Sequence, residues 1–172
     1  MFRRILVALD GSSTSNVGMK TAVELASDQH AVLVGVHVID DASITMNLED
    51  SYMPAGYVDK VYGARRKIGR TILDRSETAA RTAGVEMKSV LVESRGQPIA
   101  QAILAEARKA KADLIVIGTH GRRGVSRLLM GSAAEAVLRA APVPVLMVRS
   151  PEGETGRPVA LEEAPTSAVT VP

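Results

Sequence analysis

The segment from Gly118 to Ser132 (GTHGRRGVSRLLMGS) contains residue types that could bind an anion. Glycines stand at its first, fourth, seventh and fourteenth positions, so no Cβ prevents the backbone N–H groups there from approaching a ligand. Arg122 and Arg123 add positive charge, and Ser132 adds a hydroxyl where an alanine-rich helix is expected to begin. Together these features indicate a cradle for a polyphosphate beside the positive end of a helix dipole.

The glycine spacing alone leaves a second interpretation open. Neither the phosphate-binding pattern GxxxxGK[ST] nor the dinucleotide pattern GxGxxG occurs in the chain. Ser132 and Glu135 have the S-x-x-E spacing of a helix capping box. The segment could therefore be a structural turn followed by a capped helix instead of a nucleotide site.

Alternating apolar runs and helical patterns predict an α/β protein. Five strands are expected, at residues 3–9, 31–39, 85–93, 113–117 and 143–149. Four helices are expected between them: one capped by Ser12, Ser13 or Thr14, one ending near Gly84, one with Pro98 as its first residue, and one over about residues 133–141. This order predicts a single open parallel sheet with helices on both faces. Residues 40–58 form a polar insert, and residues 150–172 a flexible tail rich in Pro and Glu. The tyrosines at 52, 57 and 62, with Met46 and Met53, could form a lid or a partner surface, and the role of the insert stays open.

All four helices have predicted apolar faces, which for the first helix are Met19, Ala22, Val23 and Ala26 and for the third Ile99, Ala102, Ile103 and Ala110. For the long helix before Gly84 the face is Val61, Ile68, Ile72, Ala79 and Ala83. For the last helix it is Ala134, Val137, Leu138 and Ala141. The basic run Arg65-Arg66-Lys67-Arg70 is interpreted as a solvated helix face.

Three strand ends are expected to meet at one crevice. Asp10 ends the first strand, Val38 the second and Gly118 the fourth. Ligands of open parallel sheets bind beyond the carboxyl ends of the strands, where the strand order reverses. If the first and fourth strands are neighbours, the glycine segment lies at that position.

Composition excludes several classes of protein. The 172 residues include no cysteine, so disulfides and thiolate metal sites are excluded. No apolar run approaches the roughly 18 residues of a membrane span, so we expect a cytoplasmic protein without membrane insertion. The overall net charge is +2. Residues 150–172 carry a net charge of −3, so residues 1–149 carry a net charge of +5. The chain has one Phe and no Trp, which disfavours a nucleic-acid partner.

The pattern Gly118-x2-Gly121-x9-Gly131-Ser132 matches the G-x2-G-x9-G-[S/T] signature of the universal stress protein family. The opening RRILVALDGS, the second-strand end VHVI, the turn GQP at 96–98 and the closing PVPVLMVR also resemble that family. The resemblance covers residues 1–149 and is to the ATP-binding branch.

The resemblance implies a five-stranded parallel sheet of order 3-2-1-4-5, the adenine nucleotide α-hydrolase-like fold. It also implies a site for ATP, or for AMP or ADP, with Mg²⁺. The adenine and ribose end would be lined by Ala8, Asp10 and Val38, the ribose and phosphates by Gly118, His120, Gly121 and Arg122, and the phosphates at the helix start by Gly131, Ser132, Ala133 and Ala134. Family members also form homodimers by antiparallel pairing of the fifth strands, here Val143 to Arg149. Pro142 and Pro144 independently predict that this strand lies at an edge.

Three functions are consistent with the sequence. The leading hypothesis is an ATP-binding regulatory protein of the stress response that dimerises and modulates an unknown client protein, with at most slow hydrolysis. The second is a nucleotide-free dimeric interaction module. The third is a nucleotidyl-transfer enzyme of the same fold, although the HxGH and SGGxDS motifs of such enzymes do not occur and the nearest stretches are THGRRG and LDGSSTS. His120 is expected to hydrogen-bond backbone or ribose, and His37 to be structural.

Overall fold

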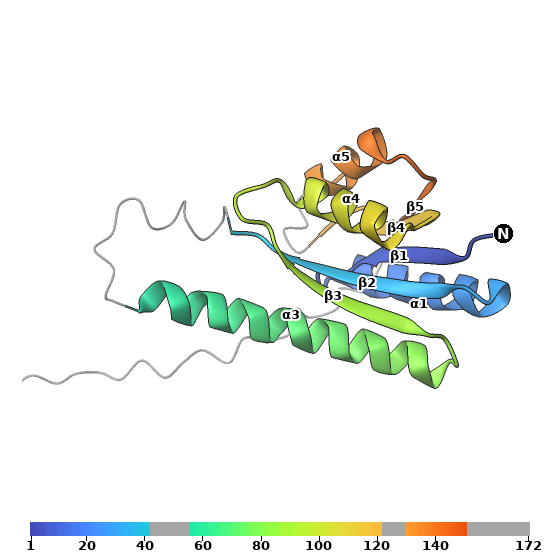
Figure 1. Cartoon of the computed structure of the whole chain (residues 1–172), viewed down its shortest axis with the longest axis horizontal. Coiled ribbons are helices and arrows are strands. Elements are labelled where there is room, and N and C mark those ends of the chain that lie inside the picture. The colour runs from blue at the N-terminus through green and yellow to red at the C-terminus, as the bar shows by residue number, and fades with distance from the viewer. Residues whose placement is uncertain (42–55, 122–129, 151–172) are drawn as a thin grey trace, which may run out of the picture.

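Five parallel strands form one sheet in the part of the chain that the computed structural model describes, which is residues 1–41, 56–121 and 130–150 (Figure 1). The strands are β1 (Arg4–Ala8), β2 (Val32–Ile39), β3 (Met87–Glu93), β4 (Leu114–Gly118) and β5 (Val145–Val148). The helices are α1 (Ser13–Gln29), α3 (Tyr57–Thr82), α4 (Ile99–Ala110) and α5 (Ser132–Ala140). The strand order is β3-β2-β1-β4-β5, so the predicted fold and order are confirmed, and each strand boundary lies within two residues of its prediction.

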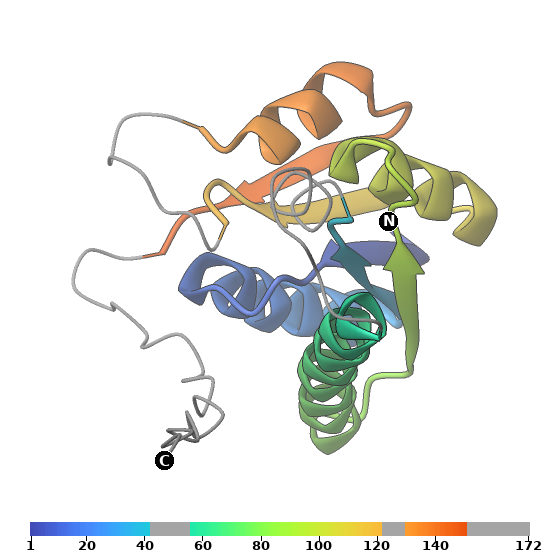
Figure 2. The ribbon, with the colours of Figure 1, turned by 90° about the vertical axis from the view of Figure 1, so that its left-hand side faces the viewer.

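Helices cover both faces of the sheet (Figure 2), and an apolar cluster fills the space between helices and sheet on each face. Helices α1 and α3 pack on one face, against side chains such as Ile5, Val7 and Val116. Helices α4 and α5 pack on the other face, against Leu6 and Ile115. The consecutive residues Ile5, Leu6 and Val7 are completely buried, as expected for a central parallel strand covered on both faces.

Local signals determine several helix ends. The N-cap of α1 is Ser12, one of the three predicted candidates, and its hydroxyl accepts a hydrogen bond from the Ser15 amide at 3.2 Å. Gly84 has a φ of +73° and follows Ala83, the C-cap of α3, so it terminates the helix as predicted. Pro98 is the N-cap of α4 and not its first residue, so that prediction was wrong by one position.

The predicted buried face of α3 was right in part, because Ile72 is half-buried and packs against the core, but the most buried residues lie about one position away from the predicted ones. Its buried residues are Gly69, Leu73 and Ala80, whereas Ala79 and Ala83 are exposed. The helix meets the sheet through Gly69, where a Cβ would lie 2.7 Å from Cδ2 of His37 and 2.6 Å from Cδ1 of Leu91. This close approach sets the rotation of the helix, so that Leu73 and Ala80 face the core while Ala79 and Ala83 face solvent.

In α5 the predicted apolar face is only partly buried. Ala134 and Val137 are buried, but Leu138 is 46% exposed, because this short helix contacts the sheet along a narrow stripe.

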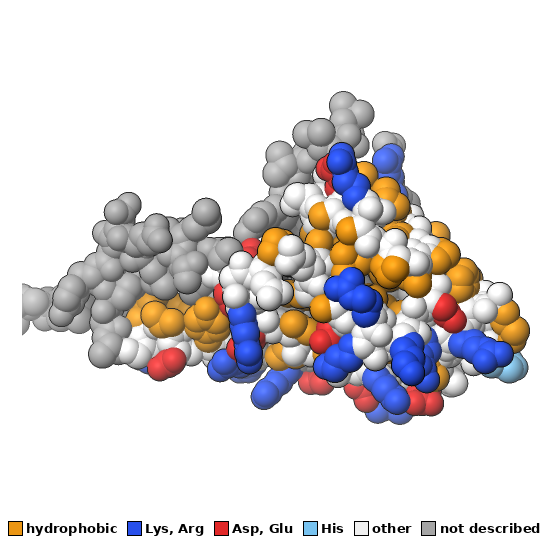
Figure 3. All heavy atoms as spheres, turned by 45° about the horizontal axis from the view of Figure 1, so that its top comes forward, with side chains coloured by type: hydrophobic (Ala, Val, Ile, Leu, Met, Phe, Trp, Pro, Cys, Tyr) orange, Lys and Arg blue, Asp and Glu red, His pale blue; other side chains and the backbone are white. Residues whose placement is uncertain are grey.

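Among the described residues, every helix is too short or too polar to span a membrane. On the described atoms of the face in Figure 3, Lys and Arg side chains are mixed with acidic and uncharged ones.

Most of the predicted insert and nearly all of the predicted tail lie outside the described residues. The division into a domain of residues 1–149 and a flexible tail of residues 150–172 therefore stays a prediction.

Candidate functional site

A cleft of about 650 Å³ opens at the carboxyl ends of β1, β2 and β4. Figure 2 looks onto this end of the sheet, with α1 and α3 on one side and α4 and α5 on the other. β1 pairs with β2 on one edge and with β4 on the other, so the strand order reverses beside the cleft. This is the position at which open parallel sheets bind ligands.

The cleft brings together all the predicted site residues that the structure describes. They are Ala8, Asp10, Val38, Gly118, His120, Gly121, Gly131, Ser132, Ala133 and Ala134. Arg122, the remaining predicted residue, lies outside the described residues.

Two glycines of the signature allow the loop after β4 to pack against the start of α1. A Cβ on Gly118 would lie 2.9 Å from the Thr14 hydroxyl and 3.2 Å from the Thr14 carbonyl carbon, and one on Gly121 would lie 2.8 Å from Oδ2 of Asp10. The Thr14 hydroxyl also donates a hydrogen bond to the His120 carbonyl oxygen. These glycines therefore have a structural role, as the second interpretation of the sequence expected, and that role also shapes the cleft wall.

The start of α5 differs from the predicted capping box. Gly131 is the N-cap, and no side chain caps the helix. Ser132 is the first helical residue, and the Glu135 carboxylate accepts a hydrogen bond from Arg139 at 2.7 Å. The capping-box prediction was wrong because Ser132 lies one position too far along the helix to act as its N-cap. The first amides of α5 face no capping side chain at the edge of the cleft, an arrangement that suits an anion.

Asp10 stabilises the turn between β1 and α1. Its Oδ1 accepts hydrogen bonds from the Ser12 amide at 2.9 Å and the Ser12 hydroxyl at 2.6 Å. Because Ser12 is the N-cap, Asp10 supports the cap without occupying its position. The carboxylate also borders the cleft.

His120 and His37 have different surroundings. Nδ1 of His120 lies 3.0 Å from the Thr119 hydroxyl, and its Nε2 is buried without a hydrogen-bond partner in the described structure. A ligand in the cleft could supply that partner. His37 is 2% exposed, with Nδ1 2.7 Å from the Leu9 carbonyl oxygen, as predicted for a structural histidine.

Sequence reasoning missed the apolar wall of the cleft and two of its charged residues. The apolar lining includes Val36, Ile99, Ile103, Ile117 and Met130. The two charged lining residues that the sequence did not predict are Asp40 and Arg65. Arg65 was assigned to a solvated helix face, and no local signal separates it from the neighbouring basic residues.

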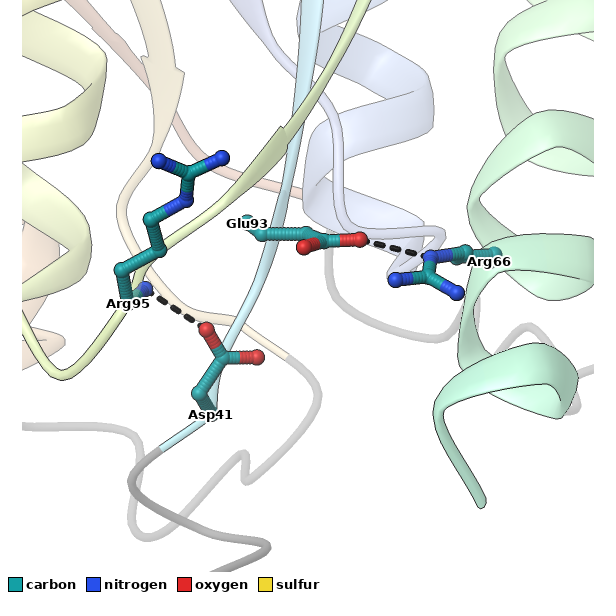
Figure 4. Close-up of polar contacts among 4 residues, drawn as sticks. All are labelled: Asp41, Arg66, Glu93 and Arg95. Carbon is teal, nitrogen blue, oxygen red and sulfur yellow. Dashed lines mark hydrogen bonds and ion pairs between the residues drawn. The ribbon is translucent and has the colours of Figure 1, made fainter. Parts of the chain in front are cut away.

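A polar cluster beside the cleft connects the ends of β2 and β3 to α3 (Figure 4). The Arg66 side chain donates a hydrogen bond to Glu93 at 2.6 Å, and this bond lowers the pKa of the Glu93 carboxyl. The Arg95 backbone amide donates to Asp41 at 2.6 Å, and the Asp41 amide donates to the Ser94 hydroxyl at 3.0 Å. These contacts hold the end of β2, and with it Asp40, at the cleft.

The sheet order and the ligand crevice define the class of this protein. A five-stranded parallel sheet of order 3-2-1-4-5, with Gly118, Gly121 and Gly131 at the reversal point, is the adenine nucleotide α-hydrolase-like fold. The model of the universal stress protein family matches residues 1–149, and the chain belongs to that family.

Individual relatives and solved structures agree with this assignment. The chain is 33% identical over 151 residues to "Universal stress protein YxiE" of Bacillus subtilis, covering 87% of this chain and 100% of the relative. A solved universal stress protein family structure from Burkholderia pseudomallei is 37% identical, with a TM-score of 0.65, and covers 84% of this chain and 93% of its own. A family protein from Arabidopsis thaliana, solved with AMP bound, shares the fold with a TM-score of 0.64 at 16% identity, over 90% of this chain and 96% of its own.

Proposed function

We propose that the cleft binds an adenine nucleotide, with ATP as the preferred form, and that the protein is a cytoplasmic regulator of the stress response. The observation that carries the proposal is that every described residue of the glycine signature lines one cleft with the ends of β1 and β2. The AMP bound to the Arabidopsis relative supports the choice of an adenine nucleotide.

The two sides of the cleft suit the two ends of a nucleotide. The first amides of α5, beginning at Ser132, would hold the phosphates, and His120 Nε2 would gain a hydrogen-bond partner. The apolar side chains of Ile99, Ile103 and Ile117 would contact the base. A volume of about 650 Å³ lies within the usual range of ligand pockets.

Mg²⁺ would enter with the phosphates and not occupy a site of its own. Among the described residues no group of three or more His, Asp and Glu side chains is placed to hold a metal. Proteins commonly bind Mg²⁺ through one or two carboxylates together with substrate phosphates. Asp10 and Asp40 would supply carboxylates at the cleft.

Occupancy by nucleotide, and not turnover, is the proposed signal to a client protein. Hydrolysis would need a base that activates water. Asp10 is engaged by the amide and hydroxyl of Ser12, and the chain has no GxxxxGK[ST] lysine to polarise the phosphates. We therefore expect at most slow hydrolysis, and the nucleotidyl-transfer alternative lacks its motifs.

Isothermal titration calorimetry with ATP, ADP, AMP and CTP tests the proposal. We expect the three adenine nucleotides to bind and CTP to bind much more weakly. ATP at one hundred times its dissociation constant should stabilise the fold by about 2.7 kcal/mol, measurable as a raised Tm. If neither heat of binding nor a change in Tm is found with any adenine nucleotide, the nucleotide-free interaction module becomes the better hypothesis.

The proposed dimer would form through the free edge of β5, and Met147→Pro should dissociate it. The carbonyl oxygens of Pro144 and Val148 accept hydrogen bonds from backbone amides in and just after β4. Because successive residues of a strand direct their backbone groups to opposite sides, the amides of Val145 and Met147 point away from β4. Proline at position 147 removes an outward donor without removing a β4 hydrogen bond. Light scattering after size exclusion should show a monomer for Met147→Pro and a dimer for wild type and Met147→Val, which keeps the amide. A dimer that survives Met147→Pro would place the interface elsewhere.

A further inference from the structure

Two adjacent arginines of α3 have different surroundings. Arg66 forms an ion pair with Glu93 at 2.6 Å, and its guanidinium lies 6.0 Å from the centre of the Tyr62 ring. Arg65 is half-buried and lines the 650 Å³ cleft. Nothing in the described structure forms a hydrogen bond or ion pair with the Arg65 side chain. Arg66 therefore pairs with an acidic residue of β3, whereas Arg65 places a guanidinium at the cleft without a direct ion pair among the described residues.

The charges of the cleft make this cation important. The charged side chains among the described lining residues are Asp10, Asp40 and Arg65. Without Arg65 that lining would carry two carboxylates, which repel a phosphate chain unless a cation lies between them. A guanidinium binds phosphate oxygens through paired, charge-assisted hydrogen bonds, and it gains most where no carboxylate has already engaged it.

The fold holds Arg65 on the opposite side of the cleft from the start of α5. Helix α3 packs on the opposite face of the sheet from α5, and its first turns extend beyond the carboxyl ends of the strands (Figures 1 and 2). The Arg66–Glu93 pair connects this part of α3 to β3. One turn further on, Gly69 brings the helix against His37. A phosphate chain at the start of α5 would therefore have Arg65 on its other side.

We infer that Arg65 is a specificity-determining residue that contacts the phosphates and makes affinity rise with their number. This inference rests on the proposed function and deepens it. Arg65 selects ATP over AMP and AMP over adenosine, because adenosine carries no charge for it to bind. The apolar wall of Ile99 and Ile103 contributes equally to all three ligands.

The test compares Arg65→Gln, Arg65→Lys and Lys67→Gln by calorimetry with adenosine, AMP and ATP at one ionic strength. Lys67 is exposed and does not line the cleft, so Lys67→Gln removes the same charge from the same helix. We expect Arg65→Gln to weaken ATP binding about tenfold and AMP binding about threefold, while adenosine changes less than about twofold. Arg65→Lys should be intermediate, and Lys67→Gln should match wild type for all three.

Two results would overturn the inference. If Arg65→Gln binds ATP as tightly as Lys67→Gln does, Arg65 does not contact the phosphates. If adenosine and ATP lose the same factor, Arg65 contacts the base or ribose instead. A wild type that binds no adenine nucleotide contradicts the proposed function itself, whereas a wild type that binds ATP alongside an unchanged Arg65→Gln contradicts only the role of Arg65. Circular dichroism of each variant shows that the fold is retained.

Discussion

Gly131→Val is expected to weaken ATP binding at least about a hundredfold, equivalent to about 2.7 kcal/mol. A Cβ at position 131 would lie 3.4 Å from the Thr119 carbonyl oxygen and 3.9 Å from the Gly121 amide nitrogen. A single methyl group fits at these distances, and we expect the two further methyl groups of valine to crowd the backbone of residues 119–121. They would separate the start of α5 from the loop after β4, and the Gly131 amide would lose its 2.8 Å hydrogen bond to Thr119. Calorimetry with ATP measures the loss, and Gly131→Ala should reduce affinity only about threefold.

A control with the same side-chain change is available on α3. Gly63 has no atom within 4 Å of a Cβ built on it, so Gly63→Val adds the same side chain without a contact. Its ATP affinity should equal that of wild type. Equal affinities of Gly131→Val and Gly63→Val would show that the start of α5 does not hold the phosphates. Gly118 is a poorer choice, because a Cβ there would press on the backbone of Thr14 at 3.2 Å and disturb the fold as well as the site.

Gly69→Val is expected to lower the free energy of unfolding by about 2–3 kcal/mol. The new Cβ would lie 2.6 Å from Leu91 and 2.7 Å from His37. His37 cannot yield easily, because it is buried and its Nδ1 lies 2.7 Å from the Leu9 carbonyl oxygen. The strain would lift α3 from β2 and β3, the strands that it covers. Urea denaturation followed by circular dichroism measures the change.

Gly63→Val is the reference for this prediction too, because it makes the same substitution earlier in the same helix. Valine is a slightly better helix former than glycine, so Gly63→Val should be as stable as wild type, or more stable by about half a kcal/mol or less. A free energy of unfolding for Gly69→Val within about 0.5 kcal/mol of that reference would mean that α3 adapts without strain. The contact through Gly69 would then not set the position of the helix.

Local patterns predicted the elements of this fold well because their signals are short-range. Apolar runs gave strand boundaries within two residues of those observed. The Ser12 cap and the Gly84 terminator were predicted from residue type, since each acts on the backbone within a few residues. The resemblance to the family, carried by the glycine signature and its flanks, pointed to ten described residues of the cleft, which lie at or just after strand ends and at one helix start.

Errors arose where two elements meet. Ser132 and Glu135 match a capping box, but the chain enters α5 at Gly131, and that entry point depends on the hydrogen bond from Gly131 to Thr119. The buried face of α3 was misjudged because Ala79 and Leu73 both fit a helical stripe. The contact of Gly69 with the sheet decides between them.

The amino-acid sequence by itself determined the family, the order of the elements and the residues at the strand ends, because these follow from patterns along the chain. Only the tertiary structure decided that Arg65 lies at the cleft while Arg66 pairs with Glu93, and that Ile99 and Ile103 form the apolar wall. Adjacent helical residues point about 100° apart. Their surroundings therefore depend on how the whole helix is turned against the sheet, which distant contacts set.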